Sequence, residues 1–175
     1  MRALGSWRQR LLTASAALLL ITCVGTSTGQ ERATFKQGGG VDAITLSSDG
    51  KWLASCGLEA TYLWNVGSGE MVRKLKAPPA KTIHALAFSP NGKTLAAGGN
   101  DYAVSIWDVV SGELQKKLEF GNGVRCLLYS RDGKRLYAGG SKDRVHSWDT
   151  TTWQEGPAFN YKYTVHAIAL TPDDK

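Results

Sequence analysis

A stretch of about 41 residues recurs along this 175-residue chain, and this repeat limits the folds open to it. Apolar runs begin at Val41, Ile83, Val124 and Val165, which are 42, 41 and 41 residues apart. Each copy holds short apolar runs separated by turn signals. A period of about 40 with four strands per unit is typical of a β-propeller blade. The sequence therefore predicts an all-β fold built from blades of four antiparallel strands.

The turn signals within each copy set the expected strand order. An Asp-Gly or Asn-Gly pair follows the first apolar run, as at Asn91-Gly92, and these pairs tolerate the positive φ of hairpin turns. The glycine pairs at 98–99 and 139–140 are expected in a second turn, since Gly clusters mark turns. The third strands carry apolar residues on both faces, which is typical of a sheet packed between two others.

Three tryptophans in phase with these turns carry a family resemblance. Trp107-Asp108 and Trp148-Asp149 are separated by one repeat, and Trp64-Asn65 is a degenerate copy. With the spacing and the turns, residues 30–175 resemble the WD-repeat β-propeller family. The resemblance implies a buried structural network in which a turn aspartate serves the tryptophan of its repeat. The residues concerned are Asp101 with Trp107, Asp143 with Trp148, and Trp64 in the first repeat.

This sequence departs from the family pattern in three respects. No Gly-His dipeptide directly precedes the first strands, and Ala97 and Ala138 replace an expected hydroxyl residue. The first repeat offers Glu59 where the family has aspartate. We therefore expect the full hydrogen-bonded network to be absent and the blades to be looser, within the same fold.

The repeat also divides the chain. Residues 29–40 align without gaps with residues 112–123, so residues 30–40 are expected to form an outer strand of the kind that closes a propeller ring. The last copy ends after its first turn, so the chain is expected to form an incomplete ring of about three and a half blades. Remaining blades beyond residue 175, or closure between chains, are the two alternatives. The predicted segments are 1–29 (signal peptide), 30–40, 41–82 (repeat 1), 83–123 (repeat 2), 124–164 (repeat 3) and 165–175 (the start of repeat 4).

The first 29 residues have the pattern of a secretory signal peptide. Three arginines precede a 14-residue apolar run, Leu11–Val24, which small residues follow. A bilayer-spanning helix needs about 20 apolar residues, so we expect no stable membrane span after cleavage. A retained anchor and lipid attachment at Cys23 remain alternatives. Export favours a secreted or periplasmic (cell-envelope) location. Because the family that the repeats resemble is mostly intracellular in eukaryotes, the resemblance implies a bacterial envelope protein.

Composition limits the cofactors and partners to expect. The net charge is +6, but residues 1–29 contribute three arginines and no acid, so the rest carries +3. This spread-out excess does not predict nucleic-acid binding, which needs clustered cations. Cys56 and Cys126 lie in separate repeats, so free thiols are expected. We found no haem, zinc or phosphate-binding motif, and we predict no cofactor and no metal site.

Recurring positions at the start of the first strands are expected to lie on one rim of the propeller. They hold a variable polar set that could bind a protein or peptide partner, or could equally be solvated loop ends. The residues at these positions, with two neighbours from adjacent turns, are Asp42, His84, Arg125, His166, Asn100 and Lys142.

The histidines do not predict an active site. His84 and His166 occupy equivalent repeat positions, whereas catalytic residues usually break a repeat's symmetry, and His146 lies in a third strand. We therefore predict an exported, non-catalytic scaffold for protein–protein interactions. The alternative is the non-catalytic repeat region of a larger exported enzyme whose catalytic domain lies beyond residue 175.

Overall fold

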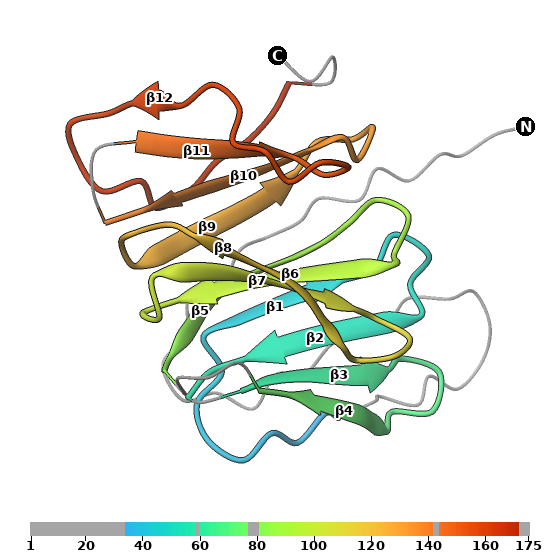
Figure 1. Ribbon diagram of the computed structural model, residues 1–175. Coiled ribbons are helices and arrows are strands. Elements are labelled where there is room, and N and C mark those ends of the chain that lie inside the picture. Colours follow the sequence, from blue (N-terminus) through green and yellow to red (C-terminus); the bar gives the residue numbers. More distant parts are fainter. Residues whose placement is uncertain (1–33, 59, 77–80, 142–143, 172–175) are drawn as a thin grey trace, which may run out of the picture.

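The computed structural model describes residues 34–58, 60–76, 81–141 and 144–171. These residues form three four-stranded antiparallel sheets, each made from one copy of the repeat (Figure 1). We call them blade 1, blade 2 and blade 3. Consecutive strands are neighbours in every sheet, so each blade is a simple meander. The prediction of an all-β fold of four-stranded antiparallel blades in an incomplete ring is confirmed.

The strands have the following bounds. Blade 1 consists of β1 (Ala43–Leu46), β2 (Trp52–Cys56), β3 (Thr61–Asn65) and β4 (Met71–Leu75). Blade 2 consists of β5 (Ile83–Phe88), β6 (Thr94–Gly99), β7 (Ala103–Asp108) and β8 (Leu114–Glu119). Blade 3 consists of β9 (Val124–Tyr129), β10 (Arg135–Gly140), β11 (Arg144–Asp149) and β12 (Phe159–Asn160). Among the described residues, no helix is long and apolar enough to cross a membrane.

A serine and a glycine fix the turn after the first strand of every blade. In blade 2, Ser89 Oγ donates to Asn91 Oδ1 at 2.8 Å and accepts from the Thr94 backbone N–H at 3.0 Å. Gly92 follows with a φ of 68°, a left-handed conformation that glycine adopts without steric cost. Blades 1 and 3 repeat these contacts from Ser47 and Ser130. The turns that the sequence predicted at these points are thus set by local hydrogen bonds.

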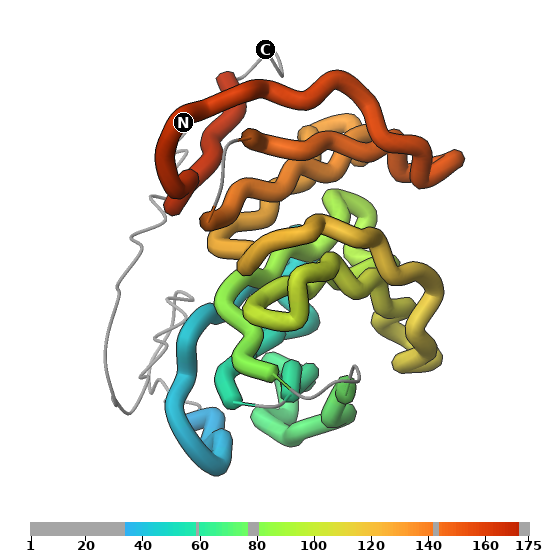
Figure 2. The backbone as a smooth tube through the Cα atoms, turned by 60° about the vertical axis from the view of Figure 1, so that its left-hand side comes forward, coloured from blue at the N-terminus to red at the C-terminus, as the bar shows by residue number. Residues whose placement is uncertain are grey.

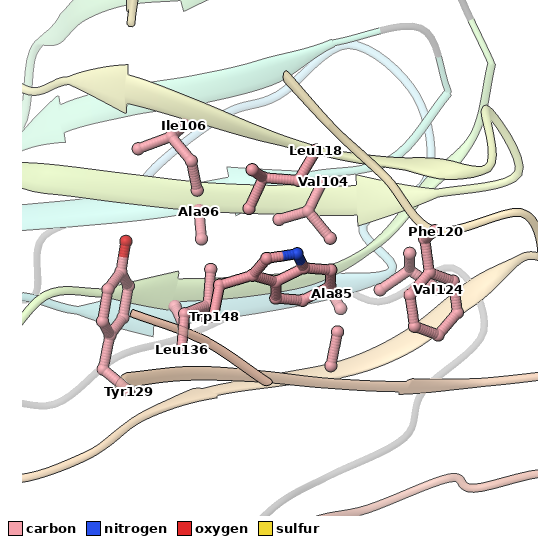
Figure 3. Close-up of a cluster of buried hydrophobic side chains, with 12 residues drawn as sticks. Ala85, Ala96, Val104, Ile106, Leu118, Phe120, Val124, Tyr129, Leu136 and Trp148 are labelled. Atoms are coloured by element: carbon pink, nitrogen blue, oxygen red, sulfur yellow. The ribbon is translucent and has the colours of Figure 1, made fainter. Parts of the chain in front are cut away.

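The blades follow one another in sequence order, with blade 2 between blades 1 and 3 (Figure 2). Two apolar cores hold them together, one on each face of blade 2. Leu63 and Leu95 contribute to the core with blade 1, while Ile106, Leu136 and Trp148 contribute to the core with blade 3 (Figure 3). This arrangement explains why the third strands are apolar on both faces.

The glycine pairs do not form the predicted second turn but end the strands β6 and β10. The reason is a close approach of backbones within each blade, where the second strand ends beside the segment that leads into the first strand. A Cβ added at Gly99 would lie 2.0 Å from Thr82 O, and one at Gly140 would lie 2.1 Å from Gly123 O. Gly57 meets Gly40 O in the same way at 2.0 Å in blade 1. Only glycine fits at these three equivalent positions.

Residues 34–40 lie against blade 1 without forming one of the named strands. The Phe35 ring meets the Trp64 ring edge-on, with centroids 5.7 Å apart. Phe35 aligns with Leu118 of β8, which is buried against blade 3 in the same manner. The contact fits the predicted role of residues 30–40 as an outer strand, of which residues 30–33 lie outside the described residues. Ring closure stays a prediction.

The start of the fourth copy lies against blade 3 as the start of each blade lies against the one before it. The Val165 N–H donates to Gly140 O at 2.9 Å, and the Ile83 N–H donates to the equivalent Gly57 O at 3.2 Å. A Cβ at Gly139 would lie 2.6 Å from Val165 Cγ1, so the approach is close. Residues 172–175 and the predicted signal peptide lie outside the described residues.

Candidate functional site

One end of the blades gathers the predicted binding positions. The strands are antiparallel, so the starts of the first strands, the loops between second and third strands, and the loops leading to the next blade share one end. We call this end the start rim, and the opposite end, which carries the Asp-Gly and Asn-Gly turns, the turn rim. The Asn100 N–H donates to Thr82 O at 3.0 Å, which ties two of the start-rim loops together.

Two bulges place rim side chains outside the strand pairing. On β5, Ile83 pairs with Gly99 and Ala85 pairs with Gly98, so His84 has no partner residue across the sheet. Arg125 occupies the same unpaired position on β9. A bulge of this kind re-aims a side chain and is common next to binding sites. The repeat therefore presents one side chain per blade at the start rim.

The predicted rim residues are partly brought together. His84 Nδ1 lies 3.9 Å from Asp42 Oδ2, so the equivalent positions of blades 1 and 2 are in contact. Arg125 and His166 are exposed, Asn100 is partly buried, and no contact joins these three residues to one another. Lys142 lies outside the described residues. His84 Nε2 is buried without a hydrogen-bond partner.

The structural network takes its fullest form in blade 1, where the sequence pattern is most degenerate. Trp64 Nε1 donates to Ser55 Oγ at 2.9 Å, and Ser55 Oγ donates to Gln37 Oε1 at 2.6 Å. Gln37 Nε2 in turn donates to Gly40 O at 3.0 Å. Sequence reasoning missed Gln37, because it compared only the residues directly before the first strand. The alignment of residues 29–40 with 112–123, which places Gln37 opposite the buried Phe120, could have drawn attention to it.

Blade 2 lacks this chain of hydrogen bonds. Ala97 stands where blade 1 has Ser55, and a small cavity of about 10 Å³ lies beside it, lined in part by Ser105 and Trp107. Asp101 Oδ1 and Ser105 Oγ are buried and have no hydrogen-bond partner among the described residues. The predicted partners Asp101 and Trp107 are therefore not joined by a hydrogen bond. In blade 3, Asp143 lies outside the described residues.

We predict opposite stability effects for two substitutions at this equivalent position. Ser55→Ala leaves the buried Trp64 Nε1 without its acceptor and should lower the free energy of unfolding by about 1–3 kcal/mol. Ala97→Ser offers Trp107 an acceptor beside the cavity and should raise it by about 1 kcal/mol. Urea unfolding followed by tryptophan fluorescence measures both. A Ser55→Ala protein as stable as the parent would contradict the assignment.

Neither thiol has the character of a nucleophile. Burial raises the pKa of Cys56 to about 12 and that of Cys126 to about 11, so both are protonated at neutral pH. Cys56 Sγ donates to Ile83 O at 3.3 Å, which gives it a place in the joint between blades 1 and 2. Both cysteines are free, Cys56 buried and Cys126 partly buried. Among the described residues, no group of three His, Cys, Asp or Glu side chains could hold a metal ion.

His146 has a packing role on β11. Its ring stacks on Trp148 with centroids 5.6 Å apart and lies 4.8 Å from the Phe120 ring. Its Nδ1 lies 2.7 Å from Glu155 Oε1, although the ring N–H is not directed well enough for a hydrogen bond. Burial lowers the pKa of His146, and the nearby Glu155 carboxylate opposes this effect without cancelling it. The side chain is a neutral core residue at neutral pH.

This environment predicts a pH dependence of stability. Because the folded state lowers the pKa of His146 from its ordinary 6.5, the unfolded chain takes up the proton first as the pH falls. The contribution of His146 to the free energy of unfolding should be constant above about pH 7 and should decrease below about pH 6.5. Urea midpoints measured between about pH 8 and pH 5 should show a loss that His146→Gln reduces. An equal loss in both proteins would contradict this role.

Comparison with known proteins agrees with this architecture. The family model for the WD domain, G-beta repeat, matches residues 29–65, 69–108 and 112–149. Small ribosomal subunit protein RACK1y of Oryza sativa subsp. japonica is 43% identical over 74 residues, covering 42% of this chain and 21% of that protein. WD repeat, SAM and U-box domain-containing protein 1 of Danio rerio is 35% identical over 80 residues, covering 45% of this chain and 16% of that protein. The chain thus spans about a fifth of the length of these relatives.

A solved structure has the same fold. A chain of Kuenenia stuttgartiensis hydrazine synthase superposes with a TM-score of 0.71 at 20% identity, covering 75% of this chain and 39% of that one. This likeness concerns the fold alone. The second and third sequence matches begin with the outer strand of one blade, β4 or β8, and end with the third strand of the next, β7 or β11. The sequence repeat is therefore offset by one strand from the sheets. The chain therefore belongs to the WD-repeat family, and its described residues form an arc of three blades.

Proposed function

We propose that this chain is a non-catalytic scaffold whose start rim binds a protein or peptide partner. The observation that carries the proposal is the pair of bulges on β5 and β9, which frees His84 and Arg125 from strand pairing at the same rim. A bulge leaves ladder hydrogen bonds unmade, and proteins keep such features where a side chain must be presented. The contact between His84 and Asp42 extends this surface onto blade 1.

The family relationship supports a role in protein interactions. WD-repeat proteins are generally non-catalytic scaffolds, and one relative, 33% identical over 86 residues, is named actin-interacting protein 1 of Drosophila melanogaster. That protein's partner is not transferred to this chain. The high pKa values of both thiols and the packing role of His146 also favour binding over catalysis in these blades.

A selection of peptides tests the proposal. The full chain would be used to select binders from a library of random peptides, and their affinities measured by fluorescence anisotropy. We expect the double variant His84→Ala, Arg125→Ala to weaken the selected peptides by about ten-fold or more. The matched control, Lys93→Ala with Lys134→Ala, changes two exposed side chains on the turn rim. Binders that lose affinity equally with both variants, or only with the control, would overturn the proposal.

We also propose that the protein is exported, on the evidence of the sequence of residues 1–29. Fusing these residues to a phosphatase that is active only after its disulfides form outside the cytoplasm tests this. The fusion should give phosphatase activity in a bacterial host, whereas a fusion that starts from residue 30 should give none. A fusion that stays in the cytoplasm would exclude export by this segment. Replacing Cys23 with serine separates lipid attachment from simple cleavage.

A further inference from the structure

We infer that the start rim binds an acidic segment of its partner, one rich in aspartate and glutamate. This inference rests on the proposed function, since it names the chemistry of the partner at the same rim. It comes from the way charges divide between the two ends of the blades. On the start rim, in its loops and the strand residues beside them, the exposed cations include Lys74, Lys76, Lys81, Lys117, Arg125, Arg144 and Lys162.

Acids are fewer on this rim. Among its described residues they are Asp42, Asp101 and Glu119. Asp42 lies 3.9 Å from His84, and among the described residues neither Asp42 nor Asp101 forms an ion pair with one of these cations. The start rim therefore presents a net positive surface.

The turn rim has the opposite balance. Its described acids, in addition to Glu155, are Asp49, Glu70, Asp108, Glu113, Asp132 and Asp149. Its cations are Lys51, Arg73, Lys93, Arg131, Lys134 and Arg135; Arg73 reaches this rim from β4 and donates to Val110 O. The charge of the blades is thus separated along the strand direction, and an acidic ligand is attracted to the start rim.

The partners of the lysines strengthen this difference. On the start rim, Lys81 Nζ lies 4.9 Å from the centre of the Tyr102 ring, and Lys74 Nζ lies 5.2 Å from that of Tyr62. Lys162 lies over the neighbouring Tyr163 at 5.9 Å. A ring attracts a cation through its quadrupole but carries no charge, so the full positive charge remains. These lysines are held in place and still available to an anion.

On the turn rim, two of the three lysines that follow the hairpin glycines lie beside an aspartate. Lys51 Nζ lies 3.5 Å from Asp49 Oδ2, and Lys134 Nζ lies 3.9 Å from Asp132 Oδ2. The hydrogen bonds from Ser47 and the Lys51 N–H also lower the pKa of Asp49, so its carboxylate stays charged at neutral pH. An anion that approaches the turn rim meets paired charges.

The spacing of the charges favours a peptide over a nucleic acid. Asp42 and Glu119 lie on the same rim as the cations, and a continuous phosphate chain crossing the rim would be repelled by them. A peptide can place separate carboxylates on Lys81 and Arg125 and neutral residues elsewhere. The exposed Tyr102, beside Lys81, adds an aromatic surface for such a peptide.

A labelled peptide of alternating glutamate and glycine tests this inference in the full chain. Its affinity, measured by fluorescence anisotropy, should exceed that of the matching glutamine peptide and should fall between about 50 and 300 mM salt. The start-rim variant Lys81→Gln, Arg125→Gln, Arg144→Gln should weaken binding about ten-fold or more. The control variant Lys51→Gln, Lys93→Gln, Lys134→Gln removes the same net charge from the turn rim and should change the affinity less than about two-fold.

Three outcomes would overturn the inference. An equal loss of affinity in the start-rim and turn-rim variants would mean that only the net charge of the protein determines binding. Equal affinities for the glutamate and glutamine peptides would mean that the acidic side chains do not contribute. A single-stranded oligonucleotide of the same charge that binds more tightly would point to a nucleic acid instead. If the library yields neutral peptides that depend on His84 and Arg125, the proposed function stands and only the acidic preference fails.

Discussion

Replacing Gly99 with alanine should unfold much of this protein. The added Cβ would lie 2.0 Å from Thr82 O and 2.7 Å from Ile83 Cα, both backbone atoms where β5 begins beside the end of β6 in blade 2. Backbone cannot rotate away as a side chain can, so these two strands have to separate at that end. We expect the free energy of unfolding to fall by more than about 3 kcal/mol, at the upper end of overpacking effects. Urea unfolding followed by tryptophan fluorescence measures this loss.

Two further glycines complete the experiment. Gly140→Ala meets Gly123 O at 2.1 Å at the equivalent place in blade 3 and should cause a similar loss. Gly38→Ala is the control, because its Cβ has no atom within 4 Å and it should leave the urea midpoint almost unchanged. If Gly99→Ala unfolds at the same urea concentration as Gly38→Ala, the backbones do not approach as described.

Removing the Trp148 ring should have the second large effect. The side chain is 4% exposed and fills the core between blades 2 and 3 (Figure 3), next to the rings of Phe120 and His146. Trp148→Ala should lower the free energy of unfolding by about 3–5 kcal/mol, because lost burial adds to the cavity left behind. Thermal unfolding followed by circular dichroism measures the change. Tyr163→Ala, at a position 67% exposed, is the control and should change stability by less than about 0.5 kcal/mol.

A phenylalanine series separates packing from hydrogen bonding. Trp64 Nε1 donates to Ser55, whereas no hydrogen bond joins the Trp148 indole N–H to a described residue. Both substitutions replace an indole with the smaller phenyl ring, so their packing losses should be similar. Trp64→Phe should therefore lower the free energy of unfolding by about 1 kcal/mol more than Trp148→Phe does. Equal costs would show that the hydrogen bond in blade 1 contributes nothing.

Much of the fold could be predicted from the sequence because its signals are local. The turn at Asn91-Gly92 needs only a glycine that adopts a positive φ and a serine, Ser89, two residues before Asn91. Both residues can be recognised in the sequence. The 41-residue period and the tryptophans in phase predicted four strands per blade and about three and a half blades, of which the described residues form three. The site was predicted less fully: the period placed His84 and Arg125 at one rim, but it could not show that bulges release them from pairing.

The remaining features depend on distances between separate segments. Gly99 looks like a turn residue in the sequence, and only the approach of Thr82 O explains why it lies in a strand. Gln37 joins Ser55, 18 residues away, only because residues 34–40 lie against blade 1. Likewise, the pairing of Lys81 with Tyr102 rather than with an acid depends on loops of two neighbouring blades. The sequence by itself determined the repeat, its strands and its turns, since these follow from local backbone preferences. The joints between blades and the charge of the start rim were decided by tertiary structure, because they depend on which segments are close in space.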